Sequence, residues 1–306
     1  MTDNIHANMK KLTAIITFLF VLIYGARSLY SSISGDDTKQ TEQTVATDSQ
    51  NEAQEETDFR EQQNSESGTA EETSADDTGK DFHIPADSKG GIIVEHKAYT
   101  LSFNKKHNTP DWVAWRLTAK HTDGQIERST KFWADPKLPR ENRVDYYEYK
   151  ESDYSRGHMC PAGDNKWSEE AMYECFYMSN MCPQDPELNG GPWGDLEKAC
   201  RRWARSEGEI FIVCGPIYKG KKHETIGINH KISVPEGFYK AVMSLQPGKE
   251  KAIAFIFSND SKNRSYRKAV MSVDEVEKKT GIDFFPKTKD SIEQRIEAKA
   301  DINDWK

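Results

Sequence analysis

Apolar and polar residues alternate in five stretches of the chain, and each stretch is bounded by glycine, proline, asparagine or aspartate. β-Branched and aromatic side chains are abundant in these stretches, and residues of this kind in alternation are typical of half-buried β-strands. The pattern therefore predicts strands over residues 92–104, 111–119, 209–218, 237–245 and 251–259.

Three helices are predicted from the residues that cap their ends. A serine precedes two of them, a glutamate completes a capping box in the last one, and proline or glycine marks other ends. The helices begin at Ser168, Pro192 and Ser272, and the last two end at Gly208 and Gly281. Strands mixed with helices in this order predict an α+β domain with a large antiparallel sheet.

The N-terminal region, residues 1–34, contains an uncharged apolar run. Lys10 and Lys11 precede this run, which extends from Leu12 to Ala26 and is closed by Arg27. A run of fifteen residues is shorter than the about 20 that span a bilayer as a helix, which favours a signal peptide. An uncleaved membrane anchor that extends to Ile33 is the alternative, and both interpretations predict export of the rest of the chain.

Residues 35–88 are rich in Glu, Gln, Thr, Ser and Asp and poor in bulky apolar side chains, so we expect a disordered acidic linker. Within it, residues 36–81 hold 15 acidic and 3 basic side chains, a net charge of −12 in a chain whose total is −8. The net negative charge of the chain therefore comes from the linker. It does not exclude an anionic partner for the globular part.

Five cysteines lie between Cys160 and Cys214, without a CxxC pair or a Cys/His spacing of a structural zinc site. In an oxidising compartment some of them are expected to form disulfides. In a reducing compartment all five would be small core residues.

The residues that carry candidate chemistry are concentrated between Tyr154 and Ala204. The candidates lie around a strand, a loop and the start of a helix, and they are Arg156, His158, Asn180, Asn189 and Glu197. Hydrolysis of a phosphodiester needs a base for water, a cation on the phosphate oxygens and help for the leaving oxygen. These residue types can supply all three.

In this segment and beyond it, the sequence resembles the DNA/RNA non-specific endonucleases, a family that includes secreted bacterial nucleases and mitochondrial endonuclease G. The resemblance implies a ββα-metal (His-Me finger) nuclease domain, which we assign to residues 89–306. The motifs that carry it are RGH (156–158), FYMSNMCPQ (176–184), LNGGPWGDLE (188–197), VCGPIY (213–218) and VPEGFYKAV (234–242).

By this resemblance His158 is the general base, Asn189 binds a single Mg²⁺ ion and Glu197 holds a water of the ion's hydration shell. Mn²⁺ is the alternative metal. The spacing agrees, because Asn189 falls just before the predicted helix and Glu197 about one turn inside it, so both can face one ion. Mg²⁺ keeps several of its waters and needs few protein ligands. A surface pair with Arg201 is the other interpretation of Glu197.

The resemblance also implies supporting residues. Arg156 shares a strand face with the base and should reach a phosphate, and Arg128, which precedes an F-x-x-D-P run, is a second candidate for this role. Asn180 is expected to support the loop after the histidine. Ser155 stands where the family usually has aspartate, which puts the positioning of Arg156 and His158 in question.

These observations predict an exported, Mg²⁺-dependent endonuclease that cleaves DNA and RNA and leaves 5′-phosphate products. Contacts limited to phosphate and sugar would give it no sequence specificity. The alternatives are a phosphodiesterase acting on small nucleotides and a catalytically silent, surface-anchored nucleic-acid-binding protein. The sequence leaves the oligomeric state open, with a homodimer as one option.

Overall fold

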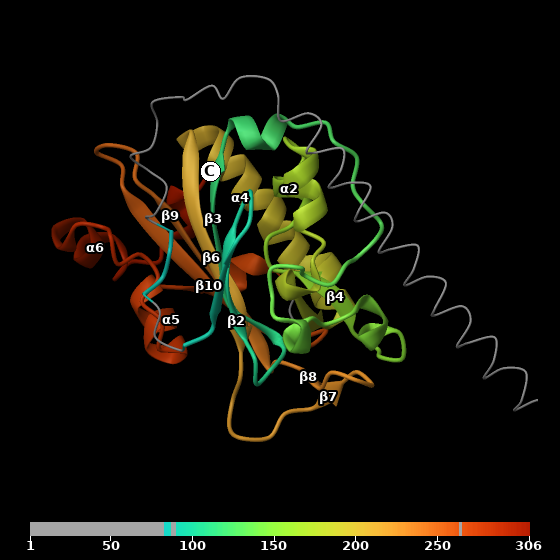
Figure 1. The fold of residues 1–306 in the computed structure, drawn as a ribbon. Helices are drawn as coiled ribbons and strands as arrows, with labels where there is room; N and C mark the ends of the chain where they lie inside the picture. The colour runs from blue at the N-terminus through green and yellow to red at the C-terminus, as the bar shows by residue number, and fades with distance from the viewer. Residues whose placement is uncertain (1–82, 87–89, 263–264) are drawn as a thin grey trace, which may run out of the picture. The chain divides into compact units, whose positions relative to one another are not determined.

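A seven-stranded antiparallel sheet forms the centre of the computed structural model, which describes residues 83–86, 90–262 and 265–306 (Figure 1). Its strand order is β1-β2-β3-β6-β9-β10-β11, and two separate ribbons pair β4 with β5 and β7 with β8. The strands are β1 (Ile92–Glu95), β2 (Thr100–Asn104), β3 (Thr109–Thr118), β4 (Ser155–His158), β5 (Met181–Gln184), β6 (Glu209–Ile217), β7 (Thr225–Ile226), β8 (Ile232–Ser233), β9 (Gly237–Ser244), β10 (Lys251–Ser258) and β11 (Val270–Met271).

The helices begin and end largely at the residues that cap them. Ser168 accepts a hydrogen bond from the backbone of Ala171, and Ser272 forms a capping box with Glu275. The long helix α4 ends at Gly208, whose φ of 84° favours glycine. The helices are α2 (Glu169–Glu174), α3 (Pro186–Leu188), α4 (Gly194–Glu207), α5 (Val273–Thr280) and α6 (Asp290–Ile296).

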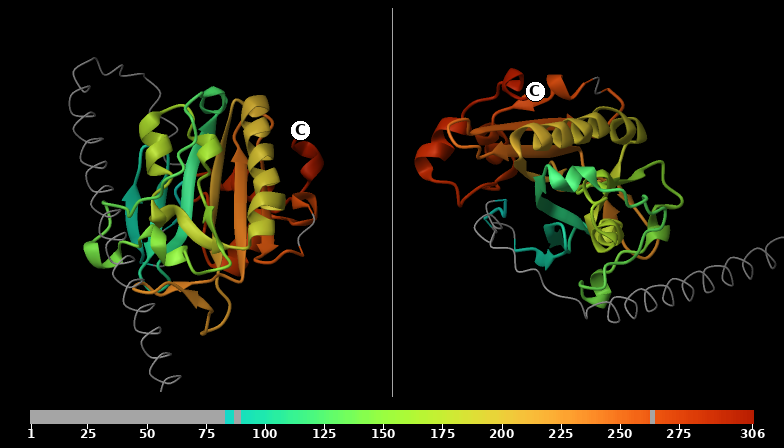
Figure 2. Two further views of the ribbon diagram at one scale, coloured as in Figure 1. Left: turned by 90° about the vertical axis from the view of Figure 1, so that its right-hand side faces the viewer. Right: turned by 90° about the horizontal axis from the view of Figure 1, so that it is seen from above.

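Alternate residues of the central strands face two hydrophobic cores. In β3, Val113 and Trp115 belong to the larger core, which also contains residues of α4 and of the β4–β5 ribbon. Trp112 and Ala114 face the smaller core, which contains residues of α5 and α6. Figures 1 and 2 show α5 and α6 on the side of the sheet away from α2 and α4. The two sets of elements therefore lie on opposite faces of one sheet.

The α+β class and the antiparallel sheet agree with the prediction, but the segment 92–104 is not one strand. It forms the hairpin β1–β2, in which the backbone N–H of His96 donates to the carbonyl of Tyr99 at 2.8 Å. The alternation of apolar and polar residues continues across this tight turn, so periodicity alone did not predict the turn. The other four predicted strands appear, with ends within two residues of those expected, as β3, β6, β9 and β10.

The predicted membrane-targeting segment, residues 1–34, and most of the predicted linker lie outside the described residues. Across the part of the chain that the structure describes, no helix combines the length and the apolar character needed to cross a membrane. Residues 83–86 fall within the predicted linker, yet they pack on the domain. His83 stacks on Phe211, and the Ala86 N–H donates to the Asp283 carbonyl at 3.0 Å. The physical reason is that Ile84 packs its apolar side chain against the smaller core.

The five cysteines are all buried as free thiols. Of the two alternatives drawn from the sequence, the structure therefore shows small core residues. Burial raises the pKa of each thiol that flanks the site, Cys160 and Cys182, well above its usual value. This protonated state suits packing and does not suit a nucleophile.

Candidate active site

The predicted site residues lie on the β4–β5 ribbon and on the helices that follow it. β4 pairs antiparallel with β5, with His158 opposite Met181 and Gly157 opposite Cys182. A Cβ atom at Gly157 would lie 2.6 Å from the Cβ of Gln184, so the position between the arginine and the histidine requires glycine. Because α3 and α4 follow β5 directly, the chain passes through the site as strand, strand and helix.

His158 is held in an aromatic environment at the end of β4, with 6% of its surface exposed. Its ring packs edge-to-face on Phe176 at a centroid distance of 4.7 Å and lies 5.8 Å from Phe132. One ring nitrogen bonds to the backbone of Arg156, whereas Nε2 is buried without a hydrogen-bond partner among the described residues. Nδ1–H is therefore the donor to the Arg156 carbonyl, and Nε2 keeps its lone pair.

Burial, together with the charge of Arg128, lowers the pKa of His158 to about 3, and the bond to the Arg156 backbone opposes this effect only partly. The imidazole is therefore neutral at neutral pH. A neutral ring with a free Nε2 lone pair is the form that can accept a proton.

Arg156 lies on the same face of β4 as His158, as predicted, since both side chains contact Phe132. The guanidinium carbon is 5.1 Å from the centre of the Phe132 ring and close to two tyrosine rings. Nη2 and Nε donate to the Tyr146 carbonyl at 2.8 and 3.2 Å. Arg156 is therefore anchored independently of Ser155, and its remaining N–H groups can bind an anion.

Arg128 interacts with site residues on both β4 and α4. It is exposed, and its guanidinium lies over the Phe176 ring at 5.2 Å, on the ring that also contacts His158. Its charge acts on both the His158 imidazole and the Glu197 carboxyl. The spacing between Arg128 and the F-x-x-D-P run matches the family pattern only loosely. The tertiary structure nevertheless brings Arg128 to the predicted site.

Asn189 lies in a wide turn, Asn189–Trp193, that connects α3 to α4. Gly191 has non-helical φ and ψ of −101° and −116°, so the regular helix begins at Gly194 and not at Pro192 as predicted. The Asn189 side chain is half-buried and makes no hydrogen bond to another described residue. Its amide oxygen is therefore available to a ligand.

Glu197 lies in the first turn of α4, as the spacing predicted. The alternative pairing with Arg201 does not form in the structure, because Arg201 donates to Asp164 instead, at 2.8 Å. Burial raises the pKa of Glu197 to about 7, an effect that the cations of Lys240 and Arg201 oppose. Its carboxyl group is thus partly desolvated and has no ion-pair partner among the described residues.

Lys240 is a buried cation behind the site that sequence reasoning missed. It is 1% exposed, and its Nζ lies 4.4 Å from the Trp193 ring and 5.0 Å from the Trp115 ring. Burial opposes its charge, but the neighbouring thiols of Cys214 and Cys200, and after them the Glu197 and Asp164 carboxyls, raise its pKa above the usual value. The sequence signal was the position of Lys240, two residues after Phe238 and two before Val242. This spacing places a charge on a buried face of the strand.

Asn180 supports the loop that follows His158. The side chain is fully buried, and its Oδ1 accepts from the Cys160 N–H at 2.9 Å. Its Nδ2 donates to the carbonyls of Cys160 and Cys175 at 2.9 and 2.8 Å. These three hydrogen bonds go to buried backbone groups, so the Asn180 side chain holds the loop in place.

We expect Asn180→Ala to destabilise the protein by about 3 kcal/mol or more, because it leaves three buried backbone groups without their partners. Urea unfolding monitored by circular dichroism measures this loss. Asn165→Ala, which removes a buried amide from the loop that Asn180 supports, is the matched control. Its loss should be smaller because, among the described residues, its Nδ2 bonds only to Cys160 Sγ and the Pro161 carbonyl. An unchanged urea midpoint for Asn180→Ala would contradict the supporting role.

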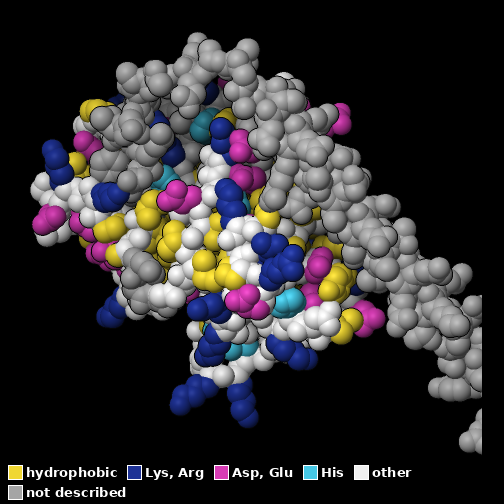
Figure 3. Space-filling model, in the orientation of Figure 1, with side chains coloured by type: hydrophobic (Ala, Val, Ile, Leu, Met, Phe, Trp, Pro, Cys, Tyr) yellow, Lys and Arg dark blue, Asp and Glu magenta, His cyan; other side chains and the backbone are white. Residues whose placement is uncertain are grey.

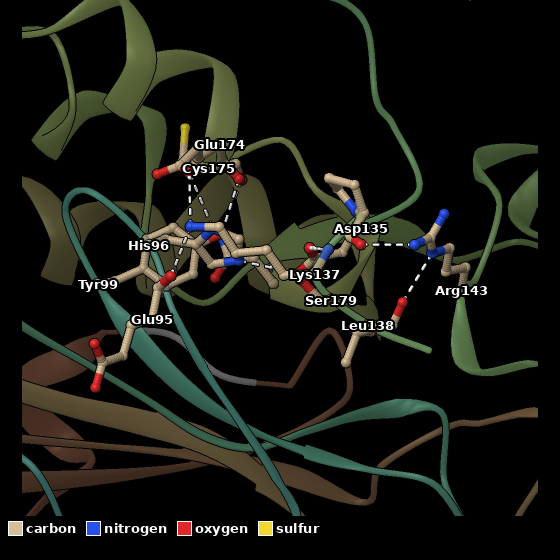
Figure 4. A network of polar contacts seen from close by, with 12 residues as sticks. Glu95, His96, Tyr99, Asp135, Lys137, Leu138, Arg143, Glu174, Cys175 and Ser179 are labelled. Carbon is tan, nitrogen blue, oxygen red and sulfur yellow. Dashed lines mark hydrogen bonds and ion pairs between the residues drawn. The ribbon is translucent and has the colours of Figure 1, made fainter. Parts of the chain in front are cut away.

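A buried ionic network centred on His96 also holds the turn that contains Asn180 (Figure 4). The His96 ring lies between Asp135, at 2.9 Å, and Glu174, at 3.2 Å, and Ser179 donates to Asp135. Burial alone would lower the pKa of His96, but the two carboxylates raise it above the usual value. The network connects the β1–β2 turn, the segment after Arg128, the end of α2 and the turn that contains Asn180.

Comparisons with known proteins agree with this fold. Residues 78–291 match the family model described as DNA/RNA non-specific endonuclease. The chain is 36% identical over 211 residues to the mitochondrial nuclease EXOG of Danio rerio, which covers 63% of this chain and 61% of that protein. It is 35% identical over 223 residues to a nuclease of Nostoc sp., with 69% and 78% covered.

Among solved structures, the chain resembles one described as the EndoG/EndoGI complex. The TM-score is 0.60 with 28% sequence identity, over 64% of this chain and 86% of that one. The fold, the ribbon-and-helix site and the match over most of the chain define the class: this chain belongs to the DNA/RNA non-specific endonuclease family. It spans about three fifths of the length of the EXOG relatives that it matches.

Proposed function

We propose that the protein is a metal-dependent endonuclease that hydrolyses phosphodiester bonds of DNA and RNA without sequence specificity. The state of His158 carries the proposal: its imidazole is neutral, its Nδ1–H bond is fixed, and its buried Nε2, beside two arginines, has no hydrogen-bond partner among the described residues. Membership of the family and relatives named as nucleases support it.

In this mechanism Nε2 of His158 takes a proton from the water that attacks phosphorus. The P–O3′ bond breaks as the new P–O bond forms, and the departing 3′ oxygen takes a proton from a second water, which leaves a 5′-phosphate and a 3′-hydroxyl. The Arg156 carbonyl keeps the imidazole in the required tautomer during this step and stabilises the imidazolium that results. Arg156 and Arg128 hold the non-bridging oxygens, because each presents N–H donors at the edge of the aromatic cluster.

The site residues also fit a hard divalent cation. An amide oxygen from Asn189 and a carboxylate from Glu197 are oxygen ligands, and neither is engaged by a protein partner among the described residues. Asn189 would hold a Mg²⁺ or Mn²⁺ ion directly, and Glu197 would hold a water of its hydration shell. Bound there, the ion would neutralise charge on the phosphate and on the departing 3′ oxygen.

Low specificity follows from the kinds of groups in the site. The arginines and the metal ligands would contact phosphate, which carries no sequence information. Exposed lysines near the β7–β8 hairpin, visible as dark blue side chains at the bottom of Figure 3, add positive charge suited to a polymer substrate. They are Lys219, Lys221, Lys222 and Lys231.

We expect the protein to degrade both plasmid DNA and RNA in the presence of Mg²⁺ and to stop when a chelator is added in excess. Gel electrophoresis measures the loss of supercoiled plasmid, and phosphatase-dependent end labelling identifies the 5′-phosphate. Digestion of dinucleotide substrates alone would instead support a small-nucleotide phosphodiesterase. Retarded but intact DNA and RNA would indicate a binding protein without catalysis.

A further inference from the structure

A group of three acidic residues lies far from the β4–β5 ribbon in the fold, at the junction of α5 and α6. One carboxylate oxygen from each of Asp274, Glu277 and Glu297 lies within 4.8 Å of the others. Residues of both helices pack in the core on the sheet face opposite the candidate active site. Nothing in the proposed phosphodiester hydrolysis uses this group.

Glu297 provides an independent indication that the group binds a ligand. The residue is 2% exposed, and its Oε1 atom is buried without a hydrogen-bond partner among the described residues. A buried carboxylate oxygen without a partner is costly, and proteins normally satisfy such an atom with a donor or a cation. Because this carboxylate is directed at two others, a cation satisfies it better than a hydrogen-bond donor.

The local charge balance supports the same conclusion. Asp283 and Glu293 add two further acidic groups that act on Glu297 and Glu277. In the described part of the chain none of these carboxylates pairs with a lysine or arginine, and Arg295 of α6 bonds to Glu250 instead.

We propose that Asp274, Glu277 and Glu297 form a second divalent-cation site, which takes Ca²⁺ and joins α5 to α6. Ca²⁺ accepts 6–8 oxygens at about 2.3–2.6 Å in flexible geometry, so oxygens on opposite sides of it are about 5 Å apart and neighbouring ones closer. The spacing of the three ligand atoms agrees with this. Mg²⁺ is less suitable, because it demands near-octahedral geometry and is usually bound by only one or two carboxylates.

The backbone holds the ligands in place before an ion binds. The N–H of Asp274 donates to the Glu297 carbonyl at 3.3 Å, so the start of α5 and the end of α6 are already connected. The N–H of Phe284 donates to Oε1 of Glu277 at 2.8 Å, which leaves the second oxygen for an ion. Asp274 is exposed and leaves room for water ligands. A bound ion would therefore stabilise the helices without reorganising them.

The test uses the full chain with Asn189→Ala, so that the proposed catalytic metal ligand is absent. In metal-free buffer, added CaCl₂ should raise the melting temperature by about 3 °C or more in a saturable way, and MgCl₂ should raise it less. Scanning fluorimetry measures the shift, and calorimetric titration should give one bound Ca²⁺. Absence of a shift at millimolar Ca²⁺ would overturn the proposal.

Glu297→Gln in that background should weaken Ca²⁺ binding about tenfold or more, because the amide keeps the shape of the carboxylate and removes its charge. Asp274→Asn, at the exposed position, is a second variant that should fold and lose the shift. Glu293→Gln removes a nearby charge outside the three ligands and should keep most of the shift. An equal loss in all three variants would show general electrostatics and contradict a coordinated ion.

Discussion

Replacing His158 by alanine should lower the rate of DNA cleavage by about 10²–10⁴-fold, the usual cost of losing a general base. The arginines and the metal ligands remain, so we expect DNA binding to change little. Plasmid digestion and fluorescence anisotropy, on protein shown to be folded by circular dichroism, measure the two quantities. The assignment fails if alanine keeps a rate within about threefold of the parent, or if glutamine at position 158 cleaves as well as histidine.

The low pKa of His158 adds a pH test to this prediction. Because burial and Arg128 lower the pKa to about 3, the neutral form should persist in the folded protein from pH 9 down to about pH 5. Protonation of His158 should therefore cause no loss of rate in this range. The ring signal that disappears from the NMR spectrum of His158→Asn should not titrate there, whereas a midpoint near 6.5 would contradict the burial argument.

Asn189→Ala should cause the second large loss of activity, about 10²–10⁴-fold, because the proposed direct metal ligand is removed and with it several kcal/mol of transition-state stabilisation. Glu197→Ala should lose less, about 10–100-fold, because water can take the place of a group that acts through the hydration shell. Steady-state rates measured over a range of Mg²⁺ concentrations separate weaker metal binding from slower chemistry.

Two variants make the metal test specific. Asn189→Asp keeps an oxygen ligand and should retain more activity than Asn189→Ala. Asp195→Asn changes an exposed carboxylate on the same turn of α4, which forms a surface ion pair with Lys198, and should leave the rate unchanged. Parent-like activity of Asn189→Ala in excess Mg²⁺ would refute the ligand assignment.

Local sequence signals predicted the regular elements well because their causes are local. Alternation of apolar residues placed β3, β6, β9 and β10, and the capping box at Ser272 placed α5. The same local pattern missed the turn inside residues 92–104, since a hairpin preserves alternation. It also missed α6, a short helix that lacks a side-chain cap at its N-terminus.

The candidate site residues were identifiable from their motifs, since RGH and LNGGPWGDLE are contiguous in the chain. Their roles remain proposals, but the structure shows how they come together. Phe176 lies between Arg128 and His158, and the Tyr146 carbonyl anchors Arg156. These contacts join residues separated by up to 48 positions, so no local pattern could predict them.

By itself, therefore, the sequence determined the α+β class, the strand periodicity, most helix ends and the identity of the candidate site residues, because each depends on neighbours within a few positions. Only the tertiary structure decided that Lys240 lies buried behind Glu197, that His96 is held between Asp135 and Glu174, and that three carboxylates meet at the end of α6. Burial and charge at these positions are set by packing between distant segments, and the free energy of a charge depends on what surrounds it after folding.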